Sequence, residues 1–583
     1  MGDQTISRKH TKERWVSSLV LSSLISATFL THALPQNIPG DAFRAMQWRL
    51  VGPFRAGRSI AAAGIPGNPY VFYFGSVDGG MWKTVNAGVT WKSIGEGLTN
   101  PSIGAMAIAP SDPNVIYVGT GEADLRSDIT YGDGIYKSTD AGEHWLHMGL
   151  NDSRHIGRVL IDPRNPEVVL VAAVGHAYGP NEERGVFRST DGGRTWTKTL
   201  YKSPDVGAVD LGSDPQNPTV VYATLWQARR TAWSQYPPDE GPGSGLYKST
   251  DEGQTWTELM GHGLPPKPFG RIGVAVASGS QGNVVYALVN AQKNGSGLYR
   301  SDDGGQQWRL TSKDPNITAR MWYFSGITVD PQNADIVYIP NRSLMRSTDG
   351  GKIFPVIKGS PGGDDYHFLW VDPQNDHRMI VASDQGTCVS VDGGSTWSSW
   401  YNQPTGQFYH VAVDNQFPYR IYGSQQDMGT TSITSRSDFG QISFRDWHPI
   451  GGEESGYIAP DPLNPNIIYG GGPYGDVTRY DHTTGQSQVI SPSVLATFGT
   501  PAPLRKYRFT WTSPIVFDRL DPHILYLGSQ VLLETRNGGL HWEEISPDLT
   551  GADKNARDRK SPPTIADASA KGWGVIYTIA PSP

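Results

Sequence analysis

Two pairs of neighbouring carboxylates occur where the chain reads as loop. Glu453-Glu454 follows a Gly-Gly turn, and Asp364-Asp365 lies close to His367. Carboxylate pairs suit glycosidic-bond hydrolysis, and the second pair with its imidazole also has the ligand types of a metal site. We take the four carboxylates as candidate catalytic residues, although adjacent acids in loops are commonly only solvated. The sequence contains no His-Glu-x-x-His, EF-hand, P-loop or Gly-x-Ser-x-Gly motif, so we predict neither a metal nor a cofactor.

A larger set of charged, histidine and aromatic residues occurs in two kinds of loop, before the first and after the second strand of each predicted repeat. Both kinds are expected at one end of a repeat array, where binding surfaces form. For any single residue, the alternative is a hydrogen-bonded loop or channel role. The candidate binding residues are Arg58, Glu122, Arg126, His155, Arg158, His176, Arg229, Arg230, Trp322, His367, His410, Gln426 and Asp427. The aromatic residues that would stack on a sugar are Trp226, Trp233, Trp322 and Tyr323.

These loops must be positioned by the elements between them, and a phrase repeated eight times shows which elements those are. One copy is Ser189-Thr-Asp191-Gly-Gly193-Arg-Thr-Trp196, and the other copies start at Thr84, Ser138, Ser249, Ser301, Ser347, Ser390 and Thr535. Asp and Gly between two strand-like runs predict a hairpin turn, in which the Asp carboxylate accepts backbone N–H bonds and Gly takes positive φ. The following Trp is suited to wedging between neighbouring sheets. Eight copies favour a structural role over a catalytic one.

A second repeat confirms the period within the sequence. Turns such as Asp162-Pro-Arg-Asn165 separate two apolar runs, and their copies give ten units of four antiparallel strands, with an eleventh starting at Gly574. Two interpretations remain open. Seven units close one ring from about residue 48 to about 400 and the rest begin a second ring, or all ten units form a single ring.

The octapeptides resemble the Asp-box, or BNR, repeat of β-propellers that include sialidases, xyloglucanases and the sortilin ectodomain. Further stretches, at Trp48–Arg58, Pro180–Gly185, Tyr401–His410 and Gly451–Tyr457, resemble large secreted bacterial proteins labelled sortilin-N-terminal-like "glycosyl hydrolases". The resemblance implies an all-β fold with a seven-bladed propeller at 44–402 and an incomplete second propeller at 403–583, cut short at the C-terminus. The alternative is one ten-bladed, sortilin-like propeller.

The resemblance also tests the enzyme families residue by residue. Xyloglucanases place a catalytic Asp in the first strand of the first blade, whereas this chain has Arg58-Ser-Ile-Ala-Ala-Ala63 there, with no acid. Sialidases carry an early Arg-Ile-Pro motif, which this sequence lacks. Both departures lower the expectation of hydrolysis.

Composition limits the partners and the location. The net charge of −7 argues against nucleic acid, and 69 Gly with 43 Pro suit an all-β chain rich in turns. A basic stretch and an apolar run, Trp15–Leu30, predict a signal peptide at 1–33 cleaved after Ala33, hence a secreted or periplasmic protein without stable membrane insertion. An uncleaved anchor is the alternative. Cys388, the single cysteine, is expected to be buried.

The sequence therefore favours a secreted propeller that binds a protein, peptide or glycan through its loop face. The alternative is a glycoside hydrolase acting on a polysaccharide such as xyloglucan. An assembly factor of the photosystem type and a plain scaffold are weaker alternatives.

Overall fold

The computed structural model describes residues 40–126, 129–230, 240–292, 294–493, 506–551 and 574–582. Contacts divide the chain into two units, Met1–Val51 and Gly52–Pro583. The described part of the first unit contains the short 3-10 helix η1 (Gly40–Phe43). The signal peptide predicted for residues 1–33 and the predicted sugar-stacking Trp233 lie outside the described residues. Within the described ranges, no helix has the length and apolar character needed to cross a bilayer.

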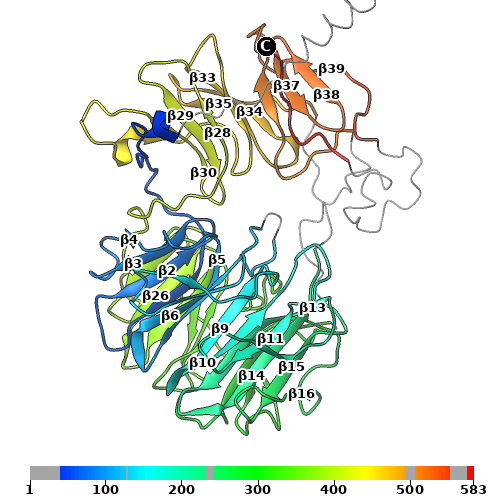
Figure 1. Ribbon diagram of the computed structural model, residues 1–583. Helices are drawn as coiled ribbons and strands as arrows, with labels where there is room; N and C mark the ends of the chain where they lie inside the picture. Colours follow the sequence, from blue (N-terminus) through cyan, green and yellow to red (C-terminus); the bar gives the residue numbers. More distant parts are fainter. Residues whose placement is uncertain are drawn as a thin grey trace, which may run out of the picture. The chain divides into compact units, whose positions relative to one another are not determined.

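The second unit consists of successive antiparallel sheets, each a meander of strands in chain order (Figure 1). The first seven sheets are β1 (Ser59–Gly64), β2 (Phe72–Ser76), β3 (Gly80–Thr84) and β4 (Lys92–Ser93); β5 (Ile103–Ala109), β6 (Asp112–Thr120), β7 (Ile135–Ser138) and β8 (Leu146–His147); β9 (Ile156–Asp162), β10 (Asn165–Ala173), β11 (Gly185–Ser189) and β12 (Thr197–Leu200); β13 (Val206–Asp214), β14 (Asn217–Gln227), β15 (Gly245–Ser249) and β16 (Thr257–Leu259); β17 (Phe269–Val276), β18 (Val285–Ala291), β19 (Gly297–Ser301) and β20 (Arg309–Ser312); β21 (Thr328–Val329), β22 (Val337–Pro340), β23 (Leu344–Ser347) and β24 (Val356–Lys358); and β25 (Tyr366–Asp372), β26 (Asn375–Ser383) and β27 (Gly386–Ser390).

Three further sheets follow. They are β28 (Phe408–Val413), β29 (Arg420–Gln425), β30 (Gly429–Thr434) and β31 (Trp447–His448); β32 (Ile458–Pro460), β33 (Ile467–Gly471), β34 (Val477–Asp481) and β35 (Gln486–Val489); and β36 (Ile515–Phe517), β37 (Leu525–Gly528), β38 (Leu532–Thr535) and β39 (Glu543–Glu544). Short 3-10 helices, η2 (Phe444–Asp446) and η3 (Pro473–Gly475), lie in the connections. Residues 574–582, where an eleventh unit is expected to begin, form no strand; the N–H of Ile576 donates to Ser529 O at 2.6 Å.

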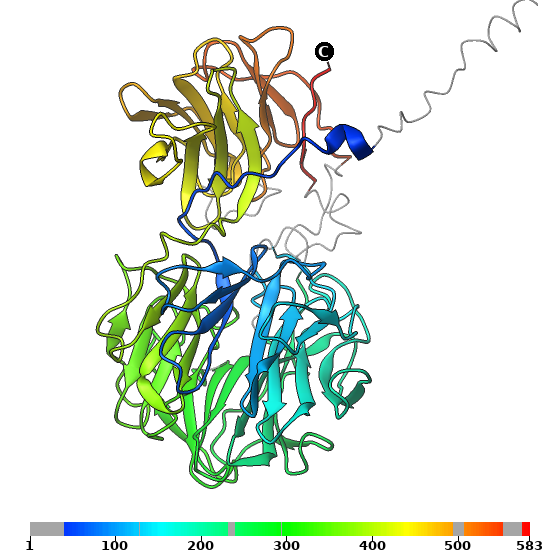
Figure 2. The ribbon, with the colours of Figure 1, turned by 60° about the vertical axis from the view of Figure 1, so that its left-hand side comes forward.

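The innermost strands contact one another in chain order from β1 through β25, and β1 also packs against β25 and β26. Figure 2 shows the first sheet, in blue, beside the seventh, in yellow-green. Strands β28, β32 and β36 contact one another in the same manner. The predicted all-β propeller class is confirmed. The assignment of 44–402 and 403–583 to two propellers stays a prediction, since the contacts group Gly52–Pro583 as one unit.

The repeated octapeptide forms the predicted turn. At Ser189, the hydroxyl accepts the N–H of Gly193 at 2.8 Å, and Asp191 Oδ1 accepts the N–H of Thr195 at 2.9 Å. Gly193 has a φ of +90°, which a residue with a Cβ rarely adopts. Asn86 makes the equivalent bond to the N–H of Thr90 at 2.9 Å, so the copies with Asn close in the same way.

In several copies the tryptophan of the phrase joins neighbouring sheets, as predicted. Trp145 Nε1 donates to Ile94 O at 2.7 Å, and Trp196 Nε1 donates to Met148 O at 2.7 Å, each oxygen belonging to the preceding sheet. The apolar core accordingly lies between consecutive sheets, as in the cluster that holds Tyr117 and Phe187. Cys388 is buried in such a cluster, and burial raises the pKa of its thiol to about 11.

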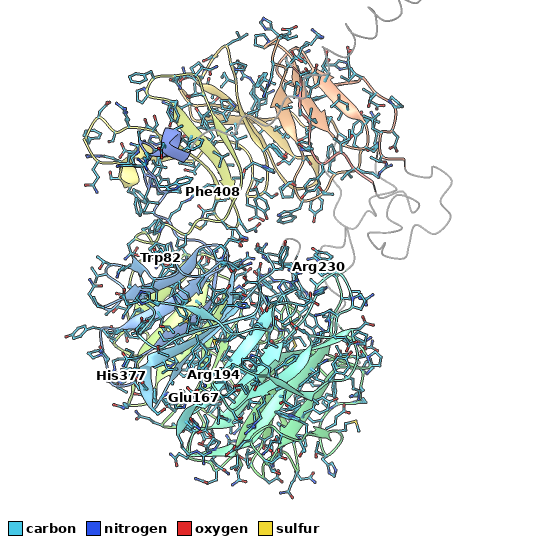
Figure 3. The ribbon with its side chains drawn as sticks, in the orientation of Figure 1. Trp82, Glu167, Arg194, Arg230, His377 and Phe408 are labelled. Carbon is cyan, nitrogen blue, oxygen red and sulfur yellow. The ribbon has the colours of Figure 1, made fainter. Side chains whose placement is uncertain are left out.

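Both kinds of turn lie at one end of the sheets. The N–H of Gly192, in an octapeptide, donates to the carbonyl of Glu167, which follows an Asp-Pro turn, at 2.9 Å. Figure 3 shows Glu167, Arg194 and His377 at this end and Arg230 away from it. The loops before first strands and after second strands therefore meet at the opposite end, as expected.

Asp191→Ala is expected to lower the free energy of unfolding, because it removes the acceptor that closes the turn. Asp191→Asn is expected to lose less, since Asn86 already closes an equivalent turn. Scanning calorimetry compares the apparent melting temperatures, with the exposed Glu96→Ala as surface control. Equal losses for Ala and Asn would contradict this account of the turn.

Candidate functional site: a buried charge network and its exposed carboxylates

A short motif before β1 brings two arginines to the inner ends of the sheets. In Arg55-Ala-Gly-Arg58, a Cβ on Gly57 would lie 2.2 Å from the carbonyl oxygen of Thr405, so only glycine permits this approach. Arg55 Nε donates to Gln425 Oε1 at 2.8 Å, and its Nη2 donates to the carbonyl of Gly429 at 3.0 Å. The motif thereby binds the eighth sheet directly.

Arg58 is the centre of a buried network. Its side chain is 1% exposed and meets three carboxylates, which come from the loops after β6, β26 and β29. Nη1 donates to Glu122 Oε1 at 3.0 Å, Nε donates to Asp384 Oδ1 at 2.7 Å, and Nη2 donates to Asp384 Oδ2 at 3.1 Å and to Asp427. Buried charges persist only when paired in this way. One guanidinium thus joins sheets that are far apart in the chain.

The network continues through alternating charges. His367 Nε2 lies 2.7 Å from Asp384 Oδ1, and its Nδ1 lies 2.8 Å from Asp124 Oδ2. Asp124 in turn pairs with Arg271 at 2.6 Å. On the other side of Arg58, Glu122 pairs with Arg126 Nε at 2.8 Å. The hydroxyl of Tyr323 donates to Asp384 Oδ2 at 2.9 Å.

The neighbours decide the protonation of the histidine. Burial opposes a charge on His367, but Asp384 and Asp124 outweigh it and raise the pKa of the imidazole to about 9. Burial likewise opposes a charge on Asp124, yet Arg271 and His367 lower the pKa of its carboxyl to about 2. His367 is therefore an imidazolium at neutral pH, held between two carboxylates.

Asp427 differs from the other members. Its side chain is 20% exposed, and burial together with Asp384 and Glu454 raises its pKa well above the usual range, against the opposing effect of Arg58. Asp384 and Glu122 have further cationic partners in His367 and Arg126, so Asp427 is the least compensated of the three. The backbone N–H of Asp427 donates to Glu454 Oε2 at 3.1 Å. A carboxyl group with a raised pKa therefore stands beside a second carboxyl group at the exposed edge of the network.

The two predicted acidic pairs lie in different surroundings. Glu454 meets Asp427, whereas the exposed Glu453 donates its backbone N–H to Gly471 O at 3.0 Å, and burial and then Asp476 raise its pKa. Asp365 accepts two bonds from Arg320 Nη2, at 2.6 and 2.8 Å, and burial and then Asp384 raise its pKa. Burial also raises the pKa of Asp364, whose N–H donates to Gln385. Among the described residues, no cluster of His, Cys, Asp and Glu could hold a metal ion.

Several predicted binding residues lie in the network or beside it. Arg58, Glu122, Arg126, His367 and Asp427 belong to it, and Gln426 donates to Asp427 Oδ1 at 2.8 Å. His155 is buried nearby, and that burial lowers the pKa of its imidazole to about 3, so it is neutral. Arg158 pairs with Asp210 at 2.7 Å and lies over the ring of Phe368 in the seventh sheet.

The other predicted residues have local partners. His176 pairs with Asp152 at 2.8 Å, and Arg229 pairs with Asp205. The guanidinium of the buried Arg230 lies over the ring of Tyr178. His410 stacks on Tyr457, with ring centroids 3.5 Å apart.

The sugar-stacking role expected for two tryptophans is wrong. Trp226 and Trp322 are 1% and 8% exposed and belong to one apolar cluster with Leu125 and Phe324. Both rings are enclosed by this cluster, Trp226 on β14 and Trp322 in the connection between β20 and β21.

Sequence reasoning missed Asp384, which bonds to Arg58, His367 and Tyr323. It occurs in Ser383-Asp-Gln-Gly386, a tight turn that directly follows a second strand. Like Glu122 and Asp427, Asp384 lies directly after the second strand of a sheet. Its turn is so short that the sequence does not mark it as a loop. Asp124 and Arg271, which complete the network, are likewise outside the predicted set.

Comparisons with known proteins point to xyloglucan-degrading enzymes. The chain is 28% identical over 282 residues to the xyloglucanase Xgh74A of Acetivibrio thermocellus, covering 42% of this chain and 31% of that protein. It is 24% identical over 530 residues to a xyloglucanase of Hypocrea jecorina, covering 77% of this chain and 60% of the relative. No protein-family model matches.

A solved structure supports the fold. The GH74 enzyme of Niastella koreensis superposes with a TM-score of 0.55 at 16% identity, over 86% of this chain and 75% of that one. The similar proteins are thus xyloglucanase-like propellers. This chain spans about a third or less of several curated relatives and 60% of another.

The raised pKa of His367 predicts that the folded protein loses stability at alkaline pH. Its folded pKa of about 9 exceeds the ordinary value of 6.5, so its contribution is fully present below pH 6.5 and is lost as the pH rises through 9. The apparent melting temperature of the wild type is expected to fall between pH 7.5 and 10 more steeply than that of His367→Gln. Parallel curves for the two proteins would contradict this assignment.

Arg58→Met is expected to cost about 3–5 kcal/mol, because it leaves buried carboxylates without their cation. The matched control is Arg164→Met, which also removes an arginine with two carboxylate partners, but at 58% exposure. Its cost is expected to be much smaller, because solvent screens an exposed ion pair. Urea unfolding followed by tryptophan fluorescence compares them, and similar midpoints would contradict the central role of Arg58.

Proposed function

We propose that this protein is a glycoside hydrolase acting on a polysaccharide such as xyloglucan. The observation that carries the proposal is Asp427, a partly exposed carboxyl whose pKa is raised and which lies beside Glu454. Glycosidases need such a pair, in which one carboxyl keeps its proton and the other is ionised. The similarity to xyloglucanases supports the choice of substrate.

The two groups take different roles in the proposed reaction. Asp427 donates its proton to the glycosidic oxygen as the bond to the anomeric carbon breaks. Glu454 accepts a proton from the water that attacks that carbon, so the substrate gains one water and both carboxyls recover their protonation after exchange with solvent. Arg58 holds the Asp427 side chain in place and does not touch the substrate. The predicted signal peptide would export the protein from the cell, where it would reach its polysaccharide substrate.

Binding without hydrolysis, the function favoured by the sequence, is the second candidate. The observation in its favour is β1, where Ser59–Gly64 contains no acid. A protein, peptide or glycan ligand would then contact the same exposed residues, and Asp427 would be a ligand contact only.

Asp427→Asn is expected to lower kcat on xyloglucan by roughly 10²–10⁴-fold, because the amide has no proton to give. Glu454→Gln is expected to act similarly, while the exposed Asp438→Asn leaves the rate unchanged. The release of reducing ends measures all four proteins. With the wild type, activity is expected to fall as the pH rises through the raised pKa of Asp427. A wild type that releases no reducing ends from any polysaccharide would overturn the hydrolase and leave binding.

A further inference from the structure

Aromatic side chains from three successive sheets meet beside Asp427. Trp511 precedes β36, Tyr474 lies in η3 after β33, and Tyr409 lies on β28. Trp511 Nε1 donates to the hydroxyl oxygen of Tyr409 at 2.8 Å, and the rings of Trp511 and Tyr474 stand edge to face with centroids 6.1 Å apart. All three side chains are half-buried, so each ring is fixed in place and keeps part of its surface exposed.

The apolar core does not account for this group. The cluster between the ninth and tenth sheets contains Tyr469, Phe509 and Trp542, but Trp511 and Tyr474 are outside it. The backbone of Tyr474 has a φ of +61°, a left-handed conformation that is costly for a residue with a Cβ. Its N–H donates to Thr510 O at 3.1 Å, which holds the segment against Trp511. Strain of this kind concentrates at functional sites.

Polar groups connect the aromatic rings to the carboxyls. The hydroxyl of Tyr409 donates to Gln426 Oε1, and Gln426 Nε2 donates to Asp427 Oδ1 at 2.8 Å. Ring faces beside amide and carboxyl groups are suited to saccharides, because CH-rich sugar faces pack on aromatic rings while the hydroxyls bond to the polar groups. The carboxyl of Glu454 disfavours an anionic sugar, and none of the three rings or Gln426 supplies a cation to attract one.

We propose that Trp511 and Tyr474, with Tyr409 and Gln426, form a subsite for a neutral pyranose ring adjoining Asp427. The subsite rests on the proposed function for its place along the polysaccharide. Its ligand is an uncharged sugar, and the aromatic rings hold the sugar unit next to the cleaved bond.

Binding is measured by isothermal titration of the full chain carrying Asp427→Asn, so that the ligand is not consumed. The probes are xyloglucan oligosaccharides and, as the anionic comparison, oligogalacturonate. Trp511→Ala in this background is expected to weaken binding of the neutral probe tenfold or more, and Trp511→Phe is expected to weaken it less. Phe444→Ala, which removes an aromatic ring that is 61% exposed on η2, is the control and keeps full affinity.

Tyr474→Gly keeps the test decisive if Trp511→Ala fails to fold. It removes the ring and relieves the left-handed backbone, so it is expected to keep the melting temperature and lose affinity. Unchanged affinity in folded Trp511→Ala or Tyr474→Gly overturns the subsite, as does equal binding of oligogalacturonate or no binding of the neutral probe. Hydrolysis by the wild type, with affinity unchanged in these variants, sinks the subsite alone. Affinity lost in the variants, with no hydrolysis by the wild type, supports the subsite and sinks the hydrolase.

Discussion

The structure depends on one buried positive charge. The guanidinium of Arg58 is 1% exposed, and its carboxylate partners come from the second, seventh and eighth sheets. Leaving such a group unpaired costs about 3–5 kcal/mol. The inner ends of these sheets therefore hold fixed positions around it, and the exposed carboxyls inherit their geometry from that constraint.

The alternation of charge explains how so many ionisable groups share a buried space. Each carboxylate has a cation or a hydroxyl donor as neighbour, and His367 is charged because it stands between Asp124 and Asp384. The alternation ends at Asp427, which shares Arg58 with Glu122 and Asp384. Those two carboxylates each have a second cationic partner. The same constraint that stabilises the interior thus leaves a carboxyl group with a raised pKa at its edge.

The repeated turn and the charge network have different structural roles. The octapeptides close hairpins at one end of the sheets and place a Trp between neighbours, which sets the spacing of the array. Their acids, such as Asp191, face solvent, where hydrogen bonds from Thr195 and Ser189 lower the pKa to about 2. Acids at that end have lowered pKa values, whereas the opposite end holds Asp364, Asp365 and Asp427, whose pKa values are raised.

The sequence by itself determined the class of the fold, the turns and the end of the sheets at which the charges gather. These follow from local patterns, because a turn needs Asp and Gly at fixed spacing and a strand needs apolar alternation. The same patterns placed Arg58 in a loop before a first strand, and Glu122 and Asp427 in loops after second strands, all at one end of the sheets. They could not show that the three meet, since the residues are separated by 64 and 369 positions in the chain.

Only the tertiary structure decided which groups are charged and which aromatic rings are buried. Asp384 lies in a turn too short for a local pattern to mark as a loop. The burial of Trp226 and Trp322 depends on residues of other sheets that pack against them. The pKa values of His367 and Asp427 are set by neighbours from distant segments, so identical local sequences in another fold would titrate differently. Burial and charge pairing are properties of the assembled sheets, and no local pattern in the chain encodes them.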